Sequence, residues 1–290
     1  MAFVTLIEQK ILASISVRVG PNYVGYRGML QRFADAVKLF LKENIKPFQS
    51  ILRIYLISPV LRLILRLIIW LVTPINNRVF YFSFSILFFI CVRGVCVYPV
   101  LSTGWSSNCK YSILGRLRRV AQIISYEVSL TLILISLVMF NNDYSLITII
   151  KIQIYIYNIF IFYPLGIIWF VSSLAETNRT PYDFSEGESE LVSGFNTEYR
   201  ARGFTLIFIA EYASIIFIGF LFVILFIRSL FFNILIVTKG LFLVFLFIWV
   251  RATLPRYRYD KLINLAWKRF LPISLSFFFF YSVINLLLNN

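Results

Sequence analysis

Residues 175–203 read AETNRTPYDFSEGESELVSGFNTEYRARG and form a polar stretch between two long apolar segments. This stretch holds six of the 13 acidic residues of a chain that is 60% hydrophobic, and it also holds three arginines. Blocks of like charge are usually disordered and mutually repelling, and a solvated tail is the simpler alternative. Because both flanking segments are strongly apolar, we predict instead an acidic functional loop held at a membrane surface.

The composition is that of an integral membrane protein. The 290 residues have a mean hydropathy of +0.83 and only 14% are charged, whereas soluble domains carry roughly 25% charged residues. The chain has no histidine, and its three cysteines lack metal-ligand spacing, which argues against histidine-ligated haem, histidine-based metal sites and serine–histidine catalysis. The opening MAFVTLIEQK has no cleavable signal pattern. The excess of Phe, Ile, Tyr and Asn points to an A/T-rich organelle genome.

Seven segments are apolar enough to cross a bilayer, which takes about 20 residues. The predicted spans are 55–75, 79–101, 120–140, 152–174, 204–227, 230–250 and 267–288. Residues 1–7 are too few to cross alone, because a helix rises about 1.5 Å per residue. Either a helix over 1–17 turns Glu8 and Lys10 inward, or a separate peptide completes the first span, and we favour the second reading. The sequence thus predicts an all-α membrane protein, with one transmembrane domain of about eight helices over residues 1–290.

Lysine and arginine gather in alternate loops. Segments 8–53, 102–119, 175–203 and 251–269 hold eight, four, three and six of the 28 basic residues. By the positive-inside rule these long polar loops all face one side, the cytoplasm or the matrix. The last segment interleaves arginine with Trp and Tyr, which favours interfacial anchoring or lipid contact over nucleic-acid binding.

Residues 18–47 contain no span and are predicted to form an interfacial loop and helix. A Gly-Pro-Asn sequence and repeated glycines signal turns. From Gln31 to Glu43, apolar residues then recur at helical spacing with charged residues on the other faces. This pattern predicts an amphipathic helix in the membrane interface.

Four cations fall inside predicted spans, namely Arg62, Arg66, Arg93 and Lys239. A charge at mid-bilayer costs at least ~2.5 kcal/mol, so each of them should face the bundle, water or a partner. Arg62 and Arg66 are four residues apart and share a helix face. Contact with another subunit or with anionic lipid is the simpler interpretation, and a role in charge conduction is the alternative.

Two acids, Glu127 and Glu211, also lie in apolar surroundings. An unpaired buried carboxylate usually takes up a proton, and a carboxyl poised between two states suits a proton relay. The alternative is a static ion pair with Lys239 or with an arginine.

Four blocks of sequence, in order along nearly the whole chain, resemble signature blocks of one family. They are GPNYVGYRGMLQRFADAVKL (20–39), GWSSNCKYSILGRLRRVAQIISYEVSL (104–130), AETNRTPYDFSEGESELVSGFNTEY (175–199) and RATLPRYRYDKLINLAWKRFLP (251–272). The family is subunit 1 of the proton-pumping NADH:ubiquinone oxidoreductase, respiratory complex I, of the mitochondrially encoded type. The resemblance implies an eight-helix subunit at the foot of the peripheral arm, multi-pass in the mitochondrial inner membrane. Such a subunit forms the membrane part of the ubiquinone chamber and the start of an acidic proton path.

The resemblance also implies roles for individual residues. Those on the proton path are Glu127, Glu176, Asp183, Glu186, Glu188, Glu190 and Glu211. Those lining the quinone chamber or its loops are Arg18, Asp35, Arg179, Phe204, Phe208 and Arg251. Those near the loop scaffold are Arg118, Arg256, Arg258 and Asp260. Quinone reduction is then expected to change the protonation of the interior carboxyls as one coupled unit.

The chain departs from the family pattern in several places. Gln9 stands where the family has an arginine that helps to line the quinone passage, which puts that contact in doubt. Arg119 stands where a small residue is usual, and Arg62, Arg66 and Arg93 stand where the family spans are apolar. The first span is also shorter than the family's. The departures at Arg62, Arg66 and Arg93 predict unusual neighbours for these three arginines.

Under the resemblance, ubiquinone is a substrate, and the iron–sulfur cluster, flavin and NADH belong to other subunits, so this chain alone has no complete active site. The implied partners are quinone-module subunits of the peripheral arm, antiporter-like membrane subunits, lipid (anionic lipid included) and a separate peptide completing the first helix, with no nucleic acid. Three alternatives remain at this point. They are a scaffolding anchor that has lost its quinone role, a stand-alone ion transporter, which would show an inverted repeat, and a cytochrome-like electron carrier, which the lack of histidine disfavours.

Overall fold

The computed structural model describes residues 1–43, 47–48, 50–74, 82–153, 156–184, 194–227 and 234–289. Over these residues the chain is helical and contains no strand, which confirms the predicted all-α class. The α-helices are α1 (Ala2–Ile15), α2 (Gln31–Leu41), α3 (Leu52–Ile69), α4 (Ser85–Val95), α5 (Val97–Ser106), α6 (Lys110–Asn141), α7 (Leu146–Ile152), α8 (Asn158–Ile161), α9 (Tyr163–Glu176), α11 (Ala201–Phe226), α12 (Ile234–Thr253), α13 (Tyr259–Leu265) and α14 (Leu271–Asn289). A π-helical turn, Ala266–Phe270, joins α13 to α14.

Six helical segments of the described chain are long and apolar enough to cross a membrane. They are Leu52–Val72, Ser85–Ser106, Lys110–Asn141, Ala201–Phe226, Leu235–Thr253 and Tyr259–Leu287. Each coincides with one of the predicted spans. The two other predicted crossings are covered by shorter helices, α1 and α9, of 14 residues each.

The predicted span 152–174 is broken into pieces. Pro164 lies in the first turn of α9, where its missing N–H costs nothing, whereas in a helix interior it would break the hydrogen-bond ladder. At the end of α7, Gln153 donates hydrogen bonds to the carbonyls of Ile224 (3.2 Å) and Leu225 (2.6 Å) at the end of α11. Helix α7 ends at Ile152, and new helices begin at Asn158 and Tyr163.

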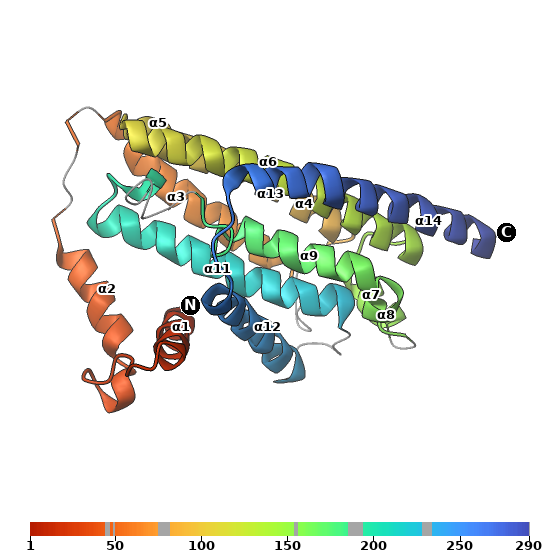
Figure 1. Cartoon of the computed structure of the whole chain (residues 1–290), viewed down its shortest axis with the longest axis horizontal. Coiled ribbons are helices and arrows are strands. Elements are labelled where there is room, and N and C mark those ends of the chain that lie inside the picture. The colour runs from red at the N-terminus through yellow and green to blue at the C-terminus, as the bar shows by residue number, and fades with distance from the viewer. Residues whose placement is uncertain are drawn as a thin grey trace.

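The predicted loop 102–119 is mostly helical. Helix α6 has 32 residues and is therefore about 48 Å long, which exceeds the ~30 Å hydrocarbon core of a bilayer. Its first turns, which carry Arg116, Arg118 and Arg119, extend the helix beyond the predicted span 120–140. Figure 1 shows α14 lying along α6, with the C-terminus projecting past the bundle.

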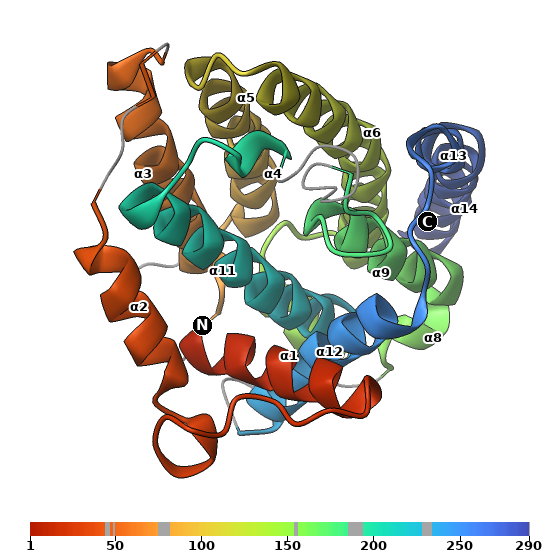
Figure 2. The same ribbon diagram turned by 60° about the vertical axis from the view of Figure 1, so that its left-hand side comes forward.

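Helix α11 is the centre of the bundle, and most of its side chains are buried. It packs against α3 on one side and α12 on the other (Figures 1 and 2). The largest fully buried side chains include Trp169 of α9, Tyr126 of α6 and Phe226 of α11. The main core thus lies where α6, α9 and α11 meet.

Three hydrogen bonds connect the four basic segments or residues directly beside them: Ile51 N donates to Ser106 O (3.0 Å), Tyr55 Oη to Glu198 O (2.8 Å) and Tyr257 N to Pro181 O (3.0 Å). The basic segments are therefore neighbours in the fold, as their alternation along the chain predicts.

The first helices form a separate edge of the molecule. Helix α1 packs against α12 and α2, and α2 also contacts α11 (Figure 2). The observed α2, Gln31–Leu41, confirms the predicted amphipathic helix, and its apolar residues Phe33 and Val37 are exposed. Glu8 of α1 is buried and so does turn inward, as one of the two interpretations of the first span proposed.

A close approach of α5 to α6 depends on Gly104. A Cβ at this position would lie 2.6 Å from the Cβ of Arg116, and that atom is fixed to its backbone. Gly104→Ala is therefore expected to force the helices apart and to cost about 1–3 kcal/mol of stability. Gly166→Ala is the matched control, because its Cβ would meet Phe226 at 3.7 Å. Thermal unfolding of the purified protein in detergent measures the difference, and equal midpoints for the two variants would contradict this packing.

Candidate functional site

A buried cluster surrounds Glu8 of α1. Tyr212 of α11 donates its hydroxyl to Glu8 Oε2 at 2.5 Å, and Arg251 of α12 donates to Glu8 Oε1. Arg179 Nη1 lies 3.5 Å from the same Oε1, and its guanidinium lies 4.6 Å from the centre of the Tyr212 ring. A cavity of about 20 Å³ opens among these side chains, which is room for one water molecule. We call Glu8, Arg179, Tyr212 and Arg251 the Glu8 cluster.

Deeper in the bundle, Glu211 of α11 forms ion pairs with two arginines. Arg62 Nη2 of α3 lies 2.8 Å from Glu211 Oε1, and Arg119 Nη1 of α6 lies 3.3 Å from the same atom. All three side chains are at most 7% exposed. The Asn178 amide, oriented with its oxygen towards Arg119, accepts from the guanidinium at 2.7 and 3.0 Å.

Glu176, the last residue of α9, is held in the same way. Arg66 Nη1 of α3 lies 3.4 Å from Glu176 Oε1, and Arg93 Nη2 of α4 lies 2.8 Å from Glu176 Oε2. The side chains of Glu176 and Arg93 are 6% and 5% exposed, and that of Arg66 is 11% exposed. Each of the two interior carboxylates thus faces two guanidinium groups from different helices.

Glu127 of α6 lies two turns after Arg119 and closes the row of acids. Its Oε1 is close to α4, because a Cβ on Gly94 would meet it at 3.5 Å. It is only partly buried. The charges of Arg93 and Glu176 are near enough to interact with it electrostatically. Within the described ranges no hydrogen bond or ion pair joins it to another side chain.

These acids and arginines lie in one row, joined by ion pairs and by charges that act on one another through space. Listed from α1 inward, its members are Glu8, Arg179, Glu211, Arg62, Arg66, Glu176, Arg93 and Glu127. Arg179 links the Glu8 cluster to Glu211 through space, and the i,i+4 spacing of Arg62 and Arg66 on α3 links Glu211 to Glu176. We call this the carboxylate–arginine row.

The interpretation of the intramembrane cations changes as a result. Arg62, Arg66 and Arg93 do not point out to another subunit or to lipid, because each turns inward to a carboxylate of this chain. The ion-pair alternative for Glu211 is what the structure shows, with arginines as partners and not Lys239. The physical reason is that a charge inside a membrane bundle is tolerated when an opposite charge lies beside it.

The described part of loop 175–203 is tied to its surroundings. Gln122 of α6 donates both amide hydrogens, to Ala175 O at 2.8 Å and to Tyr182 O at 2.9 Å. Burial, together with the neighbouring Tyr257, raises the pKa of Tyr182 to about 12, so its phenol is neutral at any physiological pH. The predicted path residues Glu186, Glu188 and Glu190 lie outside the described residues.

The predicted scaffold residues divide into two groups. Arg256 donates to the carbonyl of Asp183, and its guanidinium lies 5.8 Å from the centre of the Phe184 ring, so it does contact the acidic loop. Arg258 and Asp260 pair with each other at 3.0 Å in an exposed position. Arg118 lies half-buried on α6.

The predicted quinone-lining residues are brought together only in part. Arg179 and Arg251 meet at Glu8. The rings of Phe204 and Phe208 contact each other on α11, with centroids 4.3 Å apart.

Two predicted quinone-lining residues lie on the α1–α2 segment, where they contact local groups. Arg18 is exposed and donates to Ser16 Oγ at 3.1 Å. Asp35 accepts from Gln31 at 3.1 Å and lies 3.7 Å from Arg32. The structure does not join these residues to the Glu8 cluster.

Glu8 and Tyr212 were not among the predicted site residues, although they form the centre of the first cluster. One signal was available, since Glu8 interrupts an apolar run that a membrane helix would keep uncharged. Tyr212 carries no comparable signal in the sequence. Gln9, which stands where the resemblance leads us to expect an arginine, is exposed on α1, whereas Glu8 beside it in the chain is buried.

The part of the chain that the structure describes has no group of three or more His, Cys, Asp or Glu side chains placed to hold a metal ion. The row itself offers guanidinium charges and carboxyl groups, which can form ion pairs and hydrogen bonds.

Comparisons with known proteins place the chain in a family. Residues 1–282 match the family described as NADH dehydrogenase. The chain is 52% identical over 281 residues to the NADH-ubiquinone oxidoreductase chain 1 of Anopheles gambiae, an alignment covering 97% of this chain and 90% of that protein. It is 49% identical to the protein of the same name from Locusta migratoria, with the same coverage. The zebrafish protein, from Danio rerio, is 46% identical over 282 residues, 95% of this chain and 87% of the relative.

Two buried glutamines allow the attachment of the acidic loop to be tested. Gln122→Leu removes the two hydrogen bonds to the loop, and Gln153→Leu removes two comparable hydrogen bonds to the end of α11. Each change should cost ~1–3 kcal/mol, because buried carbonyls lose their donors. Amide hydrogen exchange in residues 176–183 should speed up in Gln122→Leu alone. Equal exchange in both variants would show that Gln122 does not hold the loop.

Proposed function

Because the chain belongs to the NADH dehydrogenase family and is a membrane subunit of respiratory complex I, we propose that it forms the membrane part of the ubiquinone-binding chamber and the acidic start of the proton-translocation path. The observation that carries this proposal is the carboxylate–arginine row, in which ion pairs at Glu8, Glu211 and Glu176 follow one another from the Glu8 cluster towards Glu127. Through it, the subunit couples electron transfer from NADH to quinone with proton pumping.

Burying this row of charges costs free energy. Burying an ion pair sets a large desolvation cost against the attraction, and well-packed apolar residues are often as stable. A scaffold alone would be served by the apolar contacts of α11. The four arginines that link Glu211 and Glu176 to α3, α4 and α6 therefore support a task in charge transfer.

The Glu8 cluster suits the quinone end of this task. Arg179, Arg251 and Tyr212 supply hydrogen-bond donors around Glu8, and the Phe204–Phe208 ring pair lies on the same helix as Tyr212. Ubiquinone, the proposed substrate, accepts two electrons and two protons at its carbonyl oxygens. The electrons come from a cofactor of another subunit, and this chain contributes donors, charge and the proton route.

Arg179 couples the Glu8 cluster to Glu211, because it interacts with both. Its guanidinium faces Glu8 and also influences Glu211, so a change of charge or position in the Glu8 cluster is felt by the next carboxylate. A reduction event at the surface loops can then change the electrostatic field that acts on the carboxyl groups deeper in the bundle.

The finer assignments of place and partners complete the proposal. The chain lies in the mitochondrial inner membrane, between quinone-module subunits of the peripheral arm and antiporter-like membrane subunits. Iron–sulfur cluster, flavin and NADH are held by those other subunits. Lipid, and a separate peptide beside α1 that completes the first span, are further proposed neighbours.

Two other functions make different predictions. A purely scaffolding subunit would not be labelled by photoreactive inhibitors of the quinone site, whereas the proposed chamber requires labelling near the Glu8 cluster. A stand-alone transporter would move ions without the peripheral arm.

Glu211→Gln tests the proton path directly. The change removes the negative charge between Arg62 and Arg119, so NADH:quinone turnover and proton pumping should both fall at least several-fold in complex that still assembles. Asp143→Asn serves as the control, because Asp143 is an exposed acid outside the row. Turnover is measured spectrophotometrically, and pumping as acidification in proteoliposomes. Normal pumping by fully assembled Glu211→Gln complex would refute the path.

A further inference from the structure

The two interior carboxylates of the row differ from Glu127 in their surroundings. Glu176 and Glu211 each lie within 3.4 Å of two guanidinium groups. Arginine does not lose its proton in proteins, so these four positive charges are permanent. Neutralising either carboxylate would leave two cations buried beside an uncharged acid, which is the costly way to break a buried ion pair.

Glu127 has no such clamp among the described residues. The charged groups that face it are Arg93 of α4 and Glu176 of α9, and Arg93 already contacts Glu176 at 2.8 Å. Glu127 is also partly exposed at the surface of the bundle. It can therefore exchange a proton with a neighbour without uncovering a buried cation.

The four clamping arginines are also the residues that depart from the family pattern. Arg62, Arg66 and Arg93 stand at positions where the resemblance leads us to expect apolar residues, and Arg119 where it leads us to expect a small one. These four arginines are not scattered through the structure, because all four side chains contact the same two carboxylates.

We propose that Arg62, Arg66, Arg93 and Arg119 hold Glu176 and Glu211 as permanent carboxylates, so that the proton passing through this chain is bound at Glu127. The step is a simple proton transfer, in which the Glu127 carboxylate takes up one proton and later releases it. Glu176 and Glu211 act as fixed charges that position the arginines. This inference rests on the proposed function and names the group that carries the proton.

Infrared difference spectra of the assembled complex, recorded between its oxidised and NADH-reduced states, test the assignment. We expect a protonated-carboxyl band that disappears in Glu127→Gln and persists in Glu176→Gln and Glu211→Gln. Loss of the band in either of the last two variants, with retention in Glu127→Gln, would overturn the assignment.

A second set of variants tests the clamp itself. Arg66→Ala with Arg93→Ala removes both cations from Glu176, so that carboxyl should now take up a proton and add a second band. Adding Glu176→Gln should abolish the new band, and this triple variant leaves no unpaired charge at the site, which protects assembly. Absence of a second band in the double variant would contradict the clamp.

The outcomes also separate this inference from the proposed function. If no carboxyl band appears in the unmodified complex, and all three glutamate variants pump normally, the acidic path itself is wrong. If pumping depends on the acids but the band follows Glu176 or Glu211, only the assignment to Glu127 fails.

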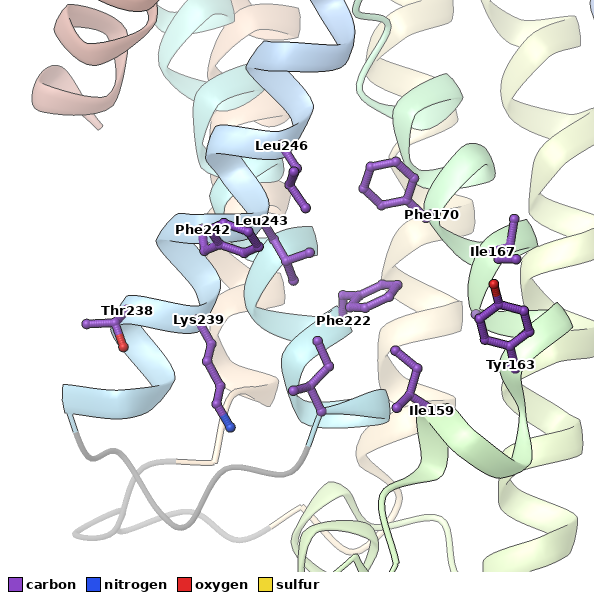
Figure 3. Close-up of a pocket in the computed structure, with 12 residues that line it drawn as sticks. Ile159, Tyr163, Ile167, Phe170, Phe222, Thr238, Lys239, Phe242, Leu243 and Leu246 are labelled. Carbon is purple, nitrogen blue, oxygen red and sulfur yellow. The ribbon is translucent and has the colours of Figure 1, made fainter.

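A second inference comes from an apolar groove on another face. A cavity of about 680 Å³ lies between α9, α11 and α12, and its walls include Phe170, Phe222 and Leu243. Figure 3 shows Lys239 with its amino nitrogen at the end of the groove nearer the start of α12. That end lies opposite the basic loops, five residues from the first residue of α12, so the amine can reach a headgroup region.

We propose that this groove binds an anionic phospholipid, with the acyl chains against the aromatic walls and the phosphate at Lys239. The charge and the apolar walls match the two parts of such a lipid.

Photoreactive phosphatidylglycerol in phosphatidylcholine vesicles provides the test, with labelled peptides mapped by mass spectrometry. Label should fall on α9 and α12 and drop several-fold in Lys239→Gln, whereas Lys151→Gln, an exposed lysine on α7, should keep it. Equal labelling by a photoreactive phosphatidylcholine, unchanged labelling in Lys239→Gln, or a polypeptide cross-linked at this face would each overturn the proposal.

Discussion

A charge buried inside an apolar bundle must have an opposite charge beside it, and the rest of this structure depends on that constraint. Glu211 sits between Arg62 and Arg119, and Glu176 sits between Arg66 and Arg93. Every pair joins two different helices. The same contacts that compensate the charges therefore fix α3, α4, α6, α9 and α11 relative to one another, and the architecture of the bundle and its proposed proton path are one set of interactions.

This arrangement also explains how a signal can travel without a large movement. Neighbouring members of the row share partners, so that a change at Glu8 alters the field at Glu211 through Arg179. In a low-dielectric interior such interactions are strong over several ångströms. Hydrogen bonds from Gln122 and Arg256 attach the loop that carries Arg179 to α6 and to the segment before α13.

The family resemblance and the structure inform each other at the four unusual arginines. As isolated departures, they suggested partners outside this chain. A charge within a membrane span needs an opposite charge beside it, and the sequence offered no acidic residue at a nearby position. Arg62 and Glu211 are 149 residues apart in the chain, and Arg66 and Glu176 are 110 apart. Pairing over such separations cannot be deduced from helical periodicity, which relates only residues three or four positions apart.

From the sequence alone followed the all-α membrane class, six of the spans, the amphipathic helix near Gln31 and the importance of the acidic stretch, because apolar length, periodicity and charge bias are local properties. The sequence also pointed to Glu127, Glu176 and Glu211 as interior acids. Only the tertiary structure decided which cations meet them, that Glu8 and Tyr212 join Arg179 and Arg251, and that the segment around Pro164 breaks. Those outcomes depend on which helix faces are brought together in the packed bundle, and that is a property of the whole fold.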